Sequence, residues 1–198
     1  MKPLQRRDLL SLEQYSEQRQ AFRQQVMAHK KNRVVYLGNH VGLYFEDRLT
    51  MQYQVQEMLR AEKIFDGAGI EEELAVYNPL IPDGGNLKAT LMLEYTDVGE
   101  RQQMLTRLVG IETRVWIQVD EFAKVWPVAD EDLERADSTK TSAVHFLRYE
   151  FSAAMIAAAQ AGARLSVGVD DAEYCTETVL TPAVCQALVA DFAVVSPT

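Results

Sequence analysis

The stretch ATLMLEYTDVGERQQMLTRLVGIETRVWIQVD, residues 89–120, contains a β-rich run, a helical segment and a second β-rich run. The stretch AVHFLRYEFSAAMIAAAQAGARLSVGVD, residues 143–170, follows the same order. In each stretch a polar residue is placed to cap the helix, and a glycine is placed to end it. These residues are Asp97 and Gly110 in the first stretch and Ser152 and Gly162 in the second. The pattern predicts a pair of strand–helix–strand units.

Two such units in succession are typical of a ferredoxin-like sheet. We therefore predict an α+β fold, with residues 88–128 and 143–180 forming matching units within one mainly antiparallel sheet. The chain is expected to be a single domain over residues 1–198, with the duplicated region at 88–198. Residues 1–80 are expected to form a helix–hairpin–helix region packed on that sheet.

The N-terminal region carries its own start and stop signals. SLEQ is a capping box in which Ser11 caps a helix and Gln14 lies three residues later. Two β-rich runs flank Gly38-Asn39, which predicts a hairpin with a two-residue type II′ turn. A helix is expected from about Asp47 to Phe65, stopped by the DGAG motif, and a shorter helix follows it. Thr181-Pro182 predicts the start of a last helix.

Composition excludes several classes of protein. The 198 residues carry a net charge of −9, with +5 on residues 1–33 and −14 on residues 34–198. An acidic body repels phosphate, so we expect no nucleic-acid partner. No run approaches the roughly 18 apolar residues of a membrane helix, and the N-terminus has no apolar signal core, so a cytoplasmic location is expected. The basic N-terminal segment either lies against the acidic body, is solvated, or docks an acidic partner.

Metal and cofactor motifs are lacking in the sequence. The cysteines, Cys175 and Cys185, have neither a zinc nor a disulfide spacing and are expected to be reduced. The histidines, His29, His40 and His145, do not lie at ligand spacing from one another. We therefore expect no bound metal and no cofactor.

The stretch FEDRLTMQYQVQEMLRAE, residues 45–62, carries two apolar faces at helical spacing. The core face is Met51, Val55, Met58, Leu59 and Phe65. The opposite face is Leu49, Tyr53, Gln56, Glu57, Arg60 and Ile64. This second face either packs on the first helix, forms a subunit interface, or lines a ligand site together with Glu46, Asp47 and Arg48. We predict that Tyr53, Gln56 and Arg60 are largely covered, by this chain or by a second copy.

Two further stretches hold candidate binding residues. The motif PDGGNLK places Asp83, Asn86 and Lys88 on a long loop that enters a strand, where a binding role competes with a plain connection. On the strand AVHFLRYE, His145 is more typical of a packed, hydrogen-bonded residue than of a base, and Arg148 lies on the other face.

Three strings together carry a resemblance to a known family. They are AHKKNRVVYLGNHVGLYFEDRLTMQYQVQEMLRAE, YNPLIPDGGNLKAT and KTSAVHFLRYE. The chain resembles, over nearly its whole length, an uncharacterised bacterial family described only as a domain of unknown function. The resemblance implies a protein of about this length whose genes often lie beside those of rubrerythrin-like and iron–sulfur oxidoreductase proteins. It implies no catalytic residue.

These observations favour a cytoplasmic accessory or binding protein, in a redox or peroxide-stress pathway, that acts through contacts with a protein partner or through self-association. The alternative is a small-molecule enzyme with a composite acid/base site. That site would be drawn from Glu46, Asp47, Arg48, Arg60, His145 and Arg148.

Overall fold

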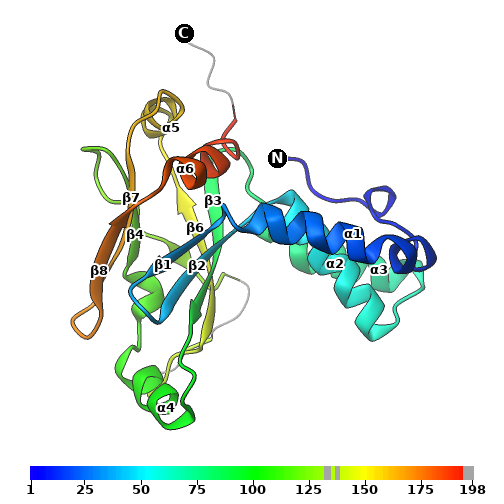
Figure 1. Ribbon diagram of the computed structural model, residues 1–198, viewed down its shortest axis with the longest axis horizontal. Helices are drawn as coiled ribbons and strands as arrows, with labels where there is room; N and C mark the ends of the chain where they lie inside the picture. The colour runs from blue at the N-terminus through cyan, green and yellow to red at the C-terminus, as the bar shows by residue number, and fades with distance from the viewer. Residues whose placement is uncertain (132–134, 137–138, 194–198) are drawn as a thin grey trace.

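The computed structural model describes residues 1–131, 135–136 and 139–193, and these form an α+β fold with two antiparallel sheets. The five-stranded sheet has the order β1-β2-β3-β6-β5, and the three-stranded sheet has the order β4-β7-β8 (Figure 1). The strands of the first sheet are β1 (Val34–Leu37), β2 (Val41–Glu46), β3 (Asn86–Leu93), β6 (Val144–Glu150) and β5 (Val128–Ala129). Those of the second are β4 (Val115–Val119), β7 (Leu165–Asp170) and β8 (Cys175–Val179). The predicted fold class is confirmed.

The two strand–helix–strand units are present, but they do not share one sheet. Each unit places its first strand in the five-stranded sheet, where β3 pairs with β6, and its second in the three-stranded sheet, where β4 pairs with β7. The predicted single sheet of ferredoxin-like type is therefore wrong. Aliphatic side chains of both sheets share one core, including Leu87 and Leu91 from β3 and Ile117 and Val119 from β4. Stacking the sheets buries these apolar faces against each other.

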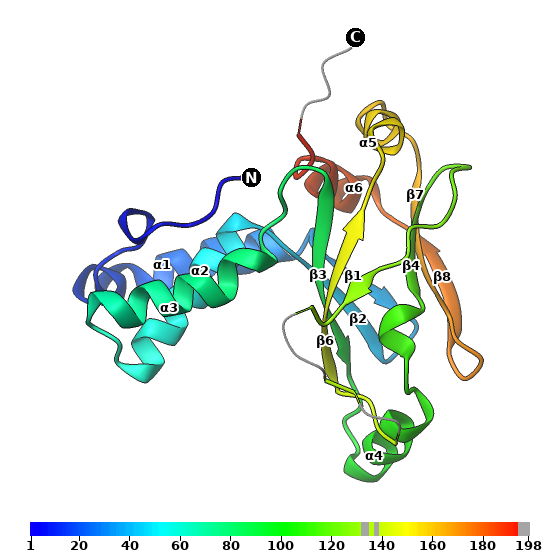
Figure 2. The same ribbon diagram turned by 180° about the vertical axis from the view of Figure 1, so that it is seen from behind.

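The connecting helices lie at opposite ends of the stacked sheets (Figures 1 and 2). They are α4 (Val98–Arg107) and α5 (Ala153–Gln160). Asp97 and Ser152 cap them through their side chains, as predicted. Gly110 and Gly162 have positive φ angles of 86° and 94°, the left-handed conformation that glycine adopts without strain. The last helix, α6 (Pro182–Val189), is capped by Thr181 as predicted.

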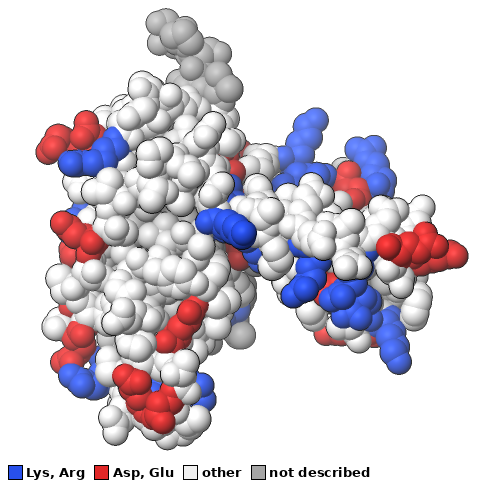
Figure 3. Space-filling model, in the orientation of Figure 1, with Lys and Arg blue, Asp and Glu red and all other residues white. Residues whose placement is uncertain are grey.

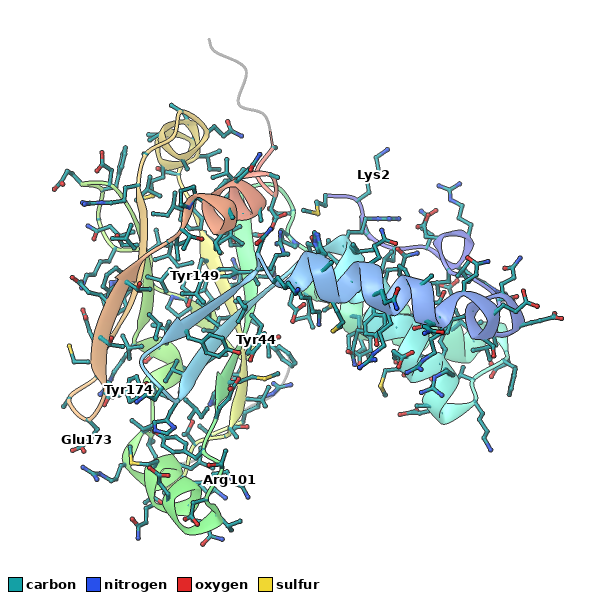
Figure 4. The ribbon with its side chains drawn as sticks, viewed as in Figure 1. Lys2, Tyr44, Arg101, Tyr149, Glu173 and Tyr174 are labelled. Carbon is teal, nitrogen blue, oxygen red and sulfur yellow. The ribbon has the colours of Figure 1, made fainter. Side chains whose placement is uncertain are left out.

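The β1–β2 hairpin belongs to the five-stranded sheet and does not pack on it as a separate region. Leu37 pairs with Val41, so the loop has three residues, and the predicted two-residue turn is wrong. Tyr174, from the turn between β7 and β8, reaches this loop (Figure 4). Its hydroxyl donates to the Leu37 carbonyl at 2.6 Å and accepts from the His40 amide at 3.2 Å. A contact between the two sheets therefore holds the longer loop.

Helices α1 (Leu12–Lys30), α2 (Arg48–Glu62) and α3 (Gly67–Tyr77) lie side by side in an arm that projects from the sheets (Figures 1 and 2). The arm has its own apolar cluster: Leu4, Met51, Val55, Leu59, Leu74 and Ile81. Ser11 and Gln14 form the predicted capping box of α1. Helix α2 ends at Glu62 because Lys63 adopts a left-handed conformation, and Asp66 caps α3. The interpretation of DGAG as a helix stop is therefore wrong, since the motif begins the next helix.

The charge asymmetry of the sequence maps onto this shape. Lys and Arg side chains stand out along the arm, whereas Asp and Glu are more frequent over the sheets (Figure 3). Two arginines of the arm pair within it, Arg19 with Glu57 at 2.7 Å and Arg48 with Asp8 at 2.8 Å. Arg33 instead reaches the body, where it pairs with Asp191. Among the residues that the structure describes, the basic segment thus pairs with the acidic body through Arg33, where the arm joins it.

Candidate functional site

A row of side chains crosses the five-stranded sheet on the face that the arm overlooks. Glu46 on β2 lies opposite Lys88 on β3, and Lys88 lies opposite Arg148 on β6. Val128 on β5 lies opposite Arg148 and completes the row. Directly opposed residues of antiparallel strands have their Cβ atoms about 5 Å apart and point to the same face. The register therefore brings together Glu46, Lys88 and Arg148, three residues that the sequence suggested separately.

A cavity of about 820 Å³ lies between the arm and this face of the sheet. Its arm side is apolar and comes from α3 and the 3₁₀ turn Asn78–Leu80; its sheet side comes from β3, β6 and the segment after β5. The arm side is lined by Ala75, Val76, Tyr77, Pro79 and Leu80. The sheet side is lined by Lys88, Glu131, Arg135, Phe146, Leu147 and Arg148. A volume of this order suits a small organic ligand.

Arg148 is held in place by two carboxylates. Its Nε and one terminal nitrogen donate to the two oxygens of Glu131, each at 2.7 Å, and its other terminal nitrogen donates to Glu150. Hydrogen bonds from Arg148 lower the pKa of Glu131 below its usual range. Such a bidentate pair fixes the guanidinium plane. Arg148 therefore contributes a guanidinium of fixed position, paired with two carboxylates, to the cavity wall.

Lys88 is half-buried in the same wall, and its ammonium group has no hydrogen bond or ion pair with any residue that the structure describes. Burial lowers the pKa of Lys88, and the neighbouring Arg148 charge lowers it further, whereas Glu131, Asp83 and Glu150 act in the opposite direction. A partly desolvated amine without a direct partner is an incompletely satisfied polar group. An incoming anionic ligand can supply the missing partner.

The other two candidates of the PDGGNLK motif shape the loop before β3. Asp83 accepts from the Gly85 amide at 2.8 Å, and Asn86 accepts from the Asp83 amide at 3.1 Å. The Asn86 amide group also donates to Glu150 at 3.0 Å. These bonds form a tight turn that sets where β3 begins. Neither side chain lines the cavity.

Of the remaining members of the predicted composite site, Glu46 shares the row with Lys88 and Arg148, and the others are dispersed. Glu46 is buried and accepts from the Thr90 hydroxyl at 2.8 Å. Asp47 caps α2 through the Thr50 amide, and Arg48 pairs with Asp8 on the arm. His145 points to the opposite face of β6 from Arg148. The cavities described for the chain do not join these residues.

His145 is fully buried and hydrogen-bonded on both ring nitrogens. Its Nδ1 lies 2.6 Å from Asp130, and its Nε2 lies 2.8 Å from the Thr141 hydroxyl and 3.1 Å from the Ser142 carbonyl. These contacts tie the segment around residues 139–142 to the end of β5. His145 is thus packed and hydrogen-bonded, the environment that the sequence favoured. It lines none of the cavities described for the chain.

The second face of α2 is covered mainly by α1 and the segment before it. Gln56 is fully buried and exchanges hydrogen bonds with the Leu10 backbone at 2.6 and 3.3 Å. Tyr53 is half-buried with its ring 6.0 Å from that of Phe22. Arg60 is exposed within the chain, so this chain does not cover it, and cover by a second copy stays a prediction. Phe65 is 71% exposed, so its predicted position on the core face is wrong.

Glu57 on the same face joins α2 to α1. It accepts from the Tyr15 hydroxyl at 2.6 Å and forms a bidentate pair with Arg19 at 2.7 Å. Hydrogen bonds from Arg19 are the largest cause that lowers the pKa of Glu57 to about 2. These contacts make Glu57 a packing residue of the arm.

A buried ionic cluster at the joint between arm and body was missed by sequence reasoning. Arg33 is 2% exposed and pairs with Asp191, while Asp47 lies 3.5 Å from Arg33 and 2.5 Å from His29. A cavity of about 430 Å³ lies beside these groups. Arg33 and Asp191 are 158 positions apart, and no local pattern signals such a pair.

Fold and site define a small α+β protein in which a helical arm and the face of an antiparallel sheet enclose a positively lined, mostly apolar cavity. Residues 3–192 match the family described as protein of unknown function DUF3501, and the chain belongs to this family.

A crystal structure of a protein of unknown function from Burkholderia pseudomallei is similar to this chain, with 50% sequence identity and a TM-score of 0.93. The match covers 97% of this chain and 100% of that one. A comparison with curated proteins gives no match. None of the helices in the described part of the chain has the length and apolar character needed to cross a membrane.

Proposed function

We propose that this protein is a binding protein for a small organic acid, held in the cavity between the arm and the five-stranded sheet. The observation that carries the proposal is Lys88, whose ammonium group is half-buried in that cavity without a direct partner among the described residues. A bound anion supplies the missing partner, and a charge-assisted hydrogen bond of this kind is strong.

The walls of the cavity support an acid that carries an apolar group. Val76, Tyr77, Pro79 and Leu80 face the site from the arm, and Phe146 faces it from β6. Burial of hydrocarbon on such walls is favourable by about 25 cal/mol per Å². A lysine provides a compact point charge, which suits one carboxylate group. The ligand class that fits both features is a monocarboxylate with an aromatic or aliphatic body.

Calorimetric titration with phenylacetate tests the proposal, with benzyl alcohol as a neutral probe of similar size. We expect phenylacetate to bind and benzyl alcohol to bind more weakly. Lys88→Met should raise the Kd for phenylacetate by about tenfold to a hundredfold, because a hydrogen bond to a charged group contributes about 1.5–3 kcal/mol. Lys31→Met makes the same charge change at an exposed position outside the cavity and should leave the Kd unchanged.

Three results would overturn the proposal. One is equal affinity for phenylacetate and benzyl alcohol, and another is an equal effect of the Lys88 and Lys31 substitutions. The third is the absence of heat and of any thermal shift with phenylacetate, hexanoate and benzoate. Melting temperatures of both variants without ligand control for damage to the fold.

The accessory role in a redox or peroxide-stress pathway, acting through protein contacts in the cytoplasm, stays a prediction supported by the family resemblance. Binding of an organic acid is compatible with it, because a ligand in the angle between arm and sheet contacts both parts and can bias a partner's access. Co-purification from the native host, with and without the Lys88→Met substitution, tests that link. If the same partners co-purify with both proteins, binding of the organic acid does not control the protein contacts.

A further inference from the structure

We propose that Lys88 is a nucleophile that forms an imine with the ligand, so that the acid bound in the cavity is an oxo acid. This inference rests on the proposed binding of an organic acid and names its chemical class. The geometric basis is an amine that lines a cavity of about 820 Å³ and is not engaged by any hydrogen bond or ion pair within the described chain. To attack a carbonyl carbon, the amine nitrogen must have a free lone pair.

The strand register keeps the Lys88 amine without a hydrogen-bond partner. Arg148, directly opposite on β6, is held by Glu131 and Glu150, so its positive charge stays beside Lys88. Glu46, directly opposite on β2, accepts a hydrogen bond from the Thr90 hydroxyl and forms no hydrogen bond or ion pair with Lys88 in the described chain. A lysine next to another cationic group in a partly apolar pocket is the usual setting of an imine-forming lysine.

The charged groups that act on Lys88 come from β6, from the segment after β5 and from the loop before β3, while Glu46 faces it from β2. Arg148 disfavours the ammonium form, while Glu131, Glu150 and Asp83 favour it, and burial disfavours it most. The sum lowers the pKa of Lys88 below its ordinary value. More of the neutral amine is therefore present near neutral pH than for a fully solvated lysine.

The reaction balances without an oxidant or reductant. The Lys88 nitrogen adds to the ketone carbon of the oxo acid, and a proton moves from nitrogen to the former carbonyl oxygen. Loss of the second nitrogen proton and of the oxygen as water leaves the carbon–nitrogen double bond. The carboxylate of the acid faces the wall lined by Arg148 and Arg135, whose guanidinium groups are paired with Glu131 and Glu150 and with Asp130.

Reductive trapping of the wild-type protein tests the proposal directly. The protein is incubated with pyruvate or phenylpyruvate and sodium cyanoborohydride at neutral pH, and modified lysines are mapped by peptide mass spectrometry. The chain has seven lysines, so exposed Lys31 and Lys63 serve as internal standards. We expect the adduct on Lys88 to exceed that on each standard by at least about tenfold, because binding positions the carbonyl. An even distribution, or an unmodified Lys88, would overturn it.

The variant Lys88→Arg separates this inference from the proposed function. Arginine retains the positive charge, so phenylacetate, which has no ketone, should still bind, whereas the trapped adduct should disappear. Binding of phenylacetate without any adduct on wild-type Lys88 would refute the imine and leave the binding function standing. Failure of all acids to bind would instead refute the binding function. Preferential labelling of Lys88 should also persist at lower pH than labelling of the two standards.

Discussion

The ionic cluster at the joint between arm and body predicts that Asp191 makes the folded state more stable in mild acid than at neutral pH. Arg33 donates to the carbonyls of Phe45, Glu46 and Ala187 at 3.0–3.2 Å and pairs with Asp191. Its guanidinium is therefore satisfied by backbone as well as by carboxylates. The perturbation is Asp191→Asn, which keeps the shape of the side chain and removes its ionisation.

Burial is the main cause that raises the pKa of Asp191 from 3.8 to about 6, and the nearby Asp47 raises it further, against the opposing effect of Arg33. Because the folded pKa lies above the unfolded one, this carboxyl contributes stability that is complete below about pH 3.8 and is lost as pH rises through about 6. At pH 4.5 the folded carboxyl is mostly protonated while the unfolded one is mostly ionised. Linkage between these states gives about 2 kcal/mol more stability at pH 4.5 than at pH 7.5.

The assay is urea unfolding at both pH values for the wild-type protein, Asp191→Asn and the control Asp120→Asn. Asp120 is exposed and has a φ of 44°, a conformation that asparagine tolerates. Other carboxylates contribute equally to all three proteins and cancel in the comparison. We expect the wild type and the control to gain about 2 kcal/mol more than Asp191→Asn on going from pH 7.5 to pH 4.5.

Parallel pH dependences of the wild type and Asp191→Asn, within the error of extrapolation, would refute the reasoning. A larger gain for the variant would mean that Asp191 is held ionised by Arg33, with the opposite sign of linkage. The slope of free energy against urea must stay constant across the series, because a change would indicate a different unfolded or native state.

Two further predictions concern the core. An added Cβ on Gly168 would lie 2.6 Å from Cε2 of Trp116 and 2.9 Å from the Thr176 carbonyl. Gly168→Ala should therefore lower the free energy of unfolding by about 1–3 kcal/mol. A double-mutant cycle should show a smaller loss in a Trp116→Leu background. Additive effects would exclude the clash with the indole ring. The Tyr149 side chain lies within the body (Figure 4), and its buried hydroxyl has no hydrogen-bond partner in the described residues. Tyr149→Phe should therefore leave the free energy of unfolding unchanged or raise it by up to about 2 kcal/mol, as thermal or urea unfolding would measure. A marked loss would show that the hydroxyl is satisfied.

Features that depend on neighbours in the chain could be predicted from the sequence. Ser11, Asp97, Ser152 and Thr181 each accept a backbone amide three residues later, and this geometry is contained within one helical turn. The strand–helix–strand order follows from local periodicity in the same way. Even at this range two predictions are wrong, those of the hairpin turn and of the DGAG motif. The hairpin loop has three residues because Tyr174 holds it, and DGAG begins a helix because the left-handed Lys63 had already ended the preceding one.

By itself, the sequence determined the α+β class, the main helix caps and the individual presence of Lys88 and Arg148 on β-rich segments. Only the tertiary structure decided that the two units divide between stacked sheets, that Lys88 lies opposite Arg148, and that the arm covers them to form a cavity. It also decided the pair of Arg33 with Asp191. The physical reason is that caps and periodicity depend on contacts within one turn, whereas strand pairing and ion pairs between distant segments depend on which surfaces must be buried together.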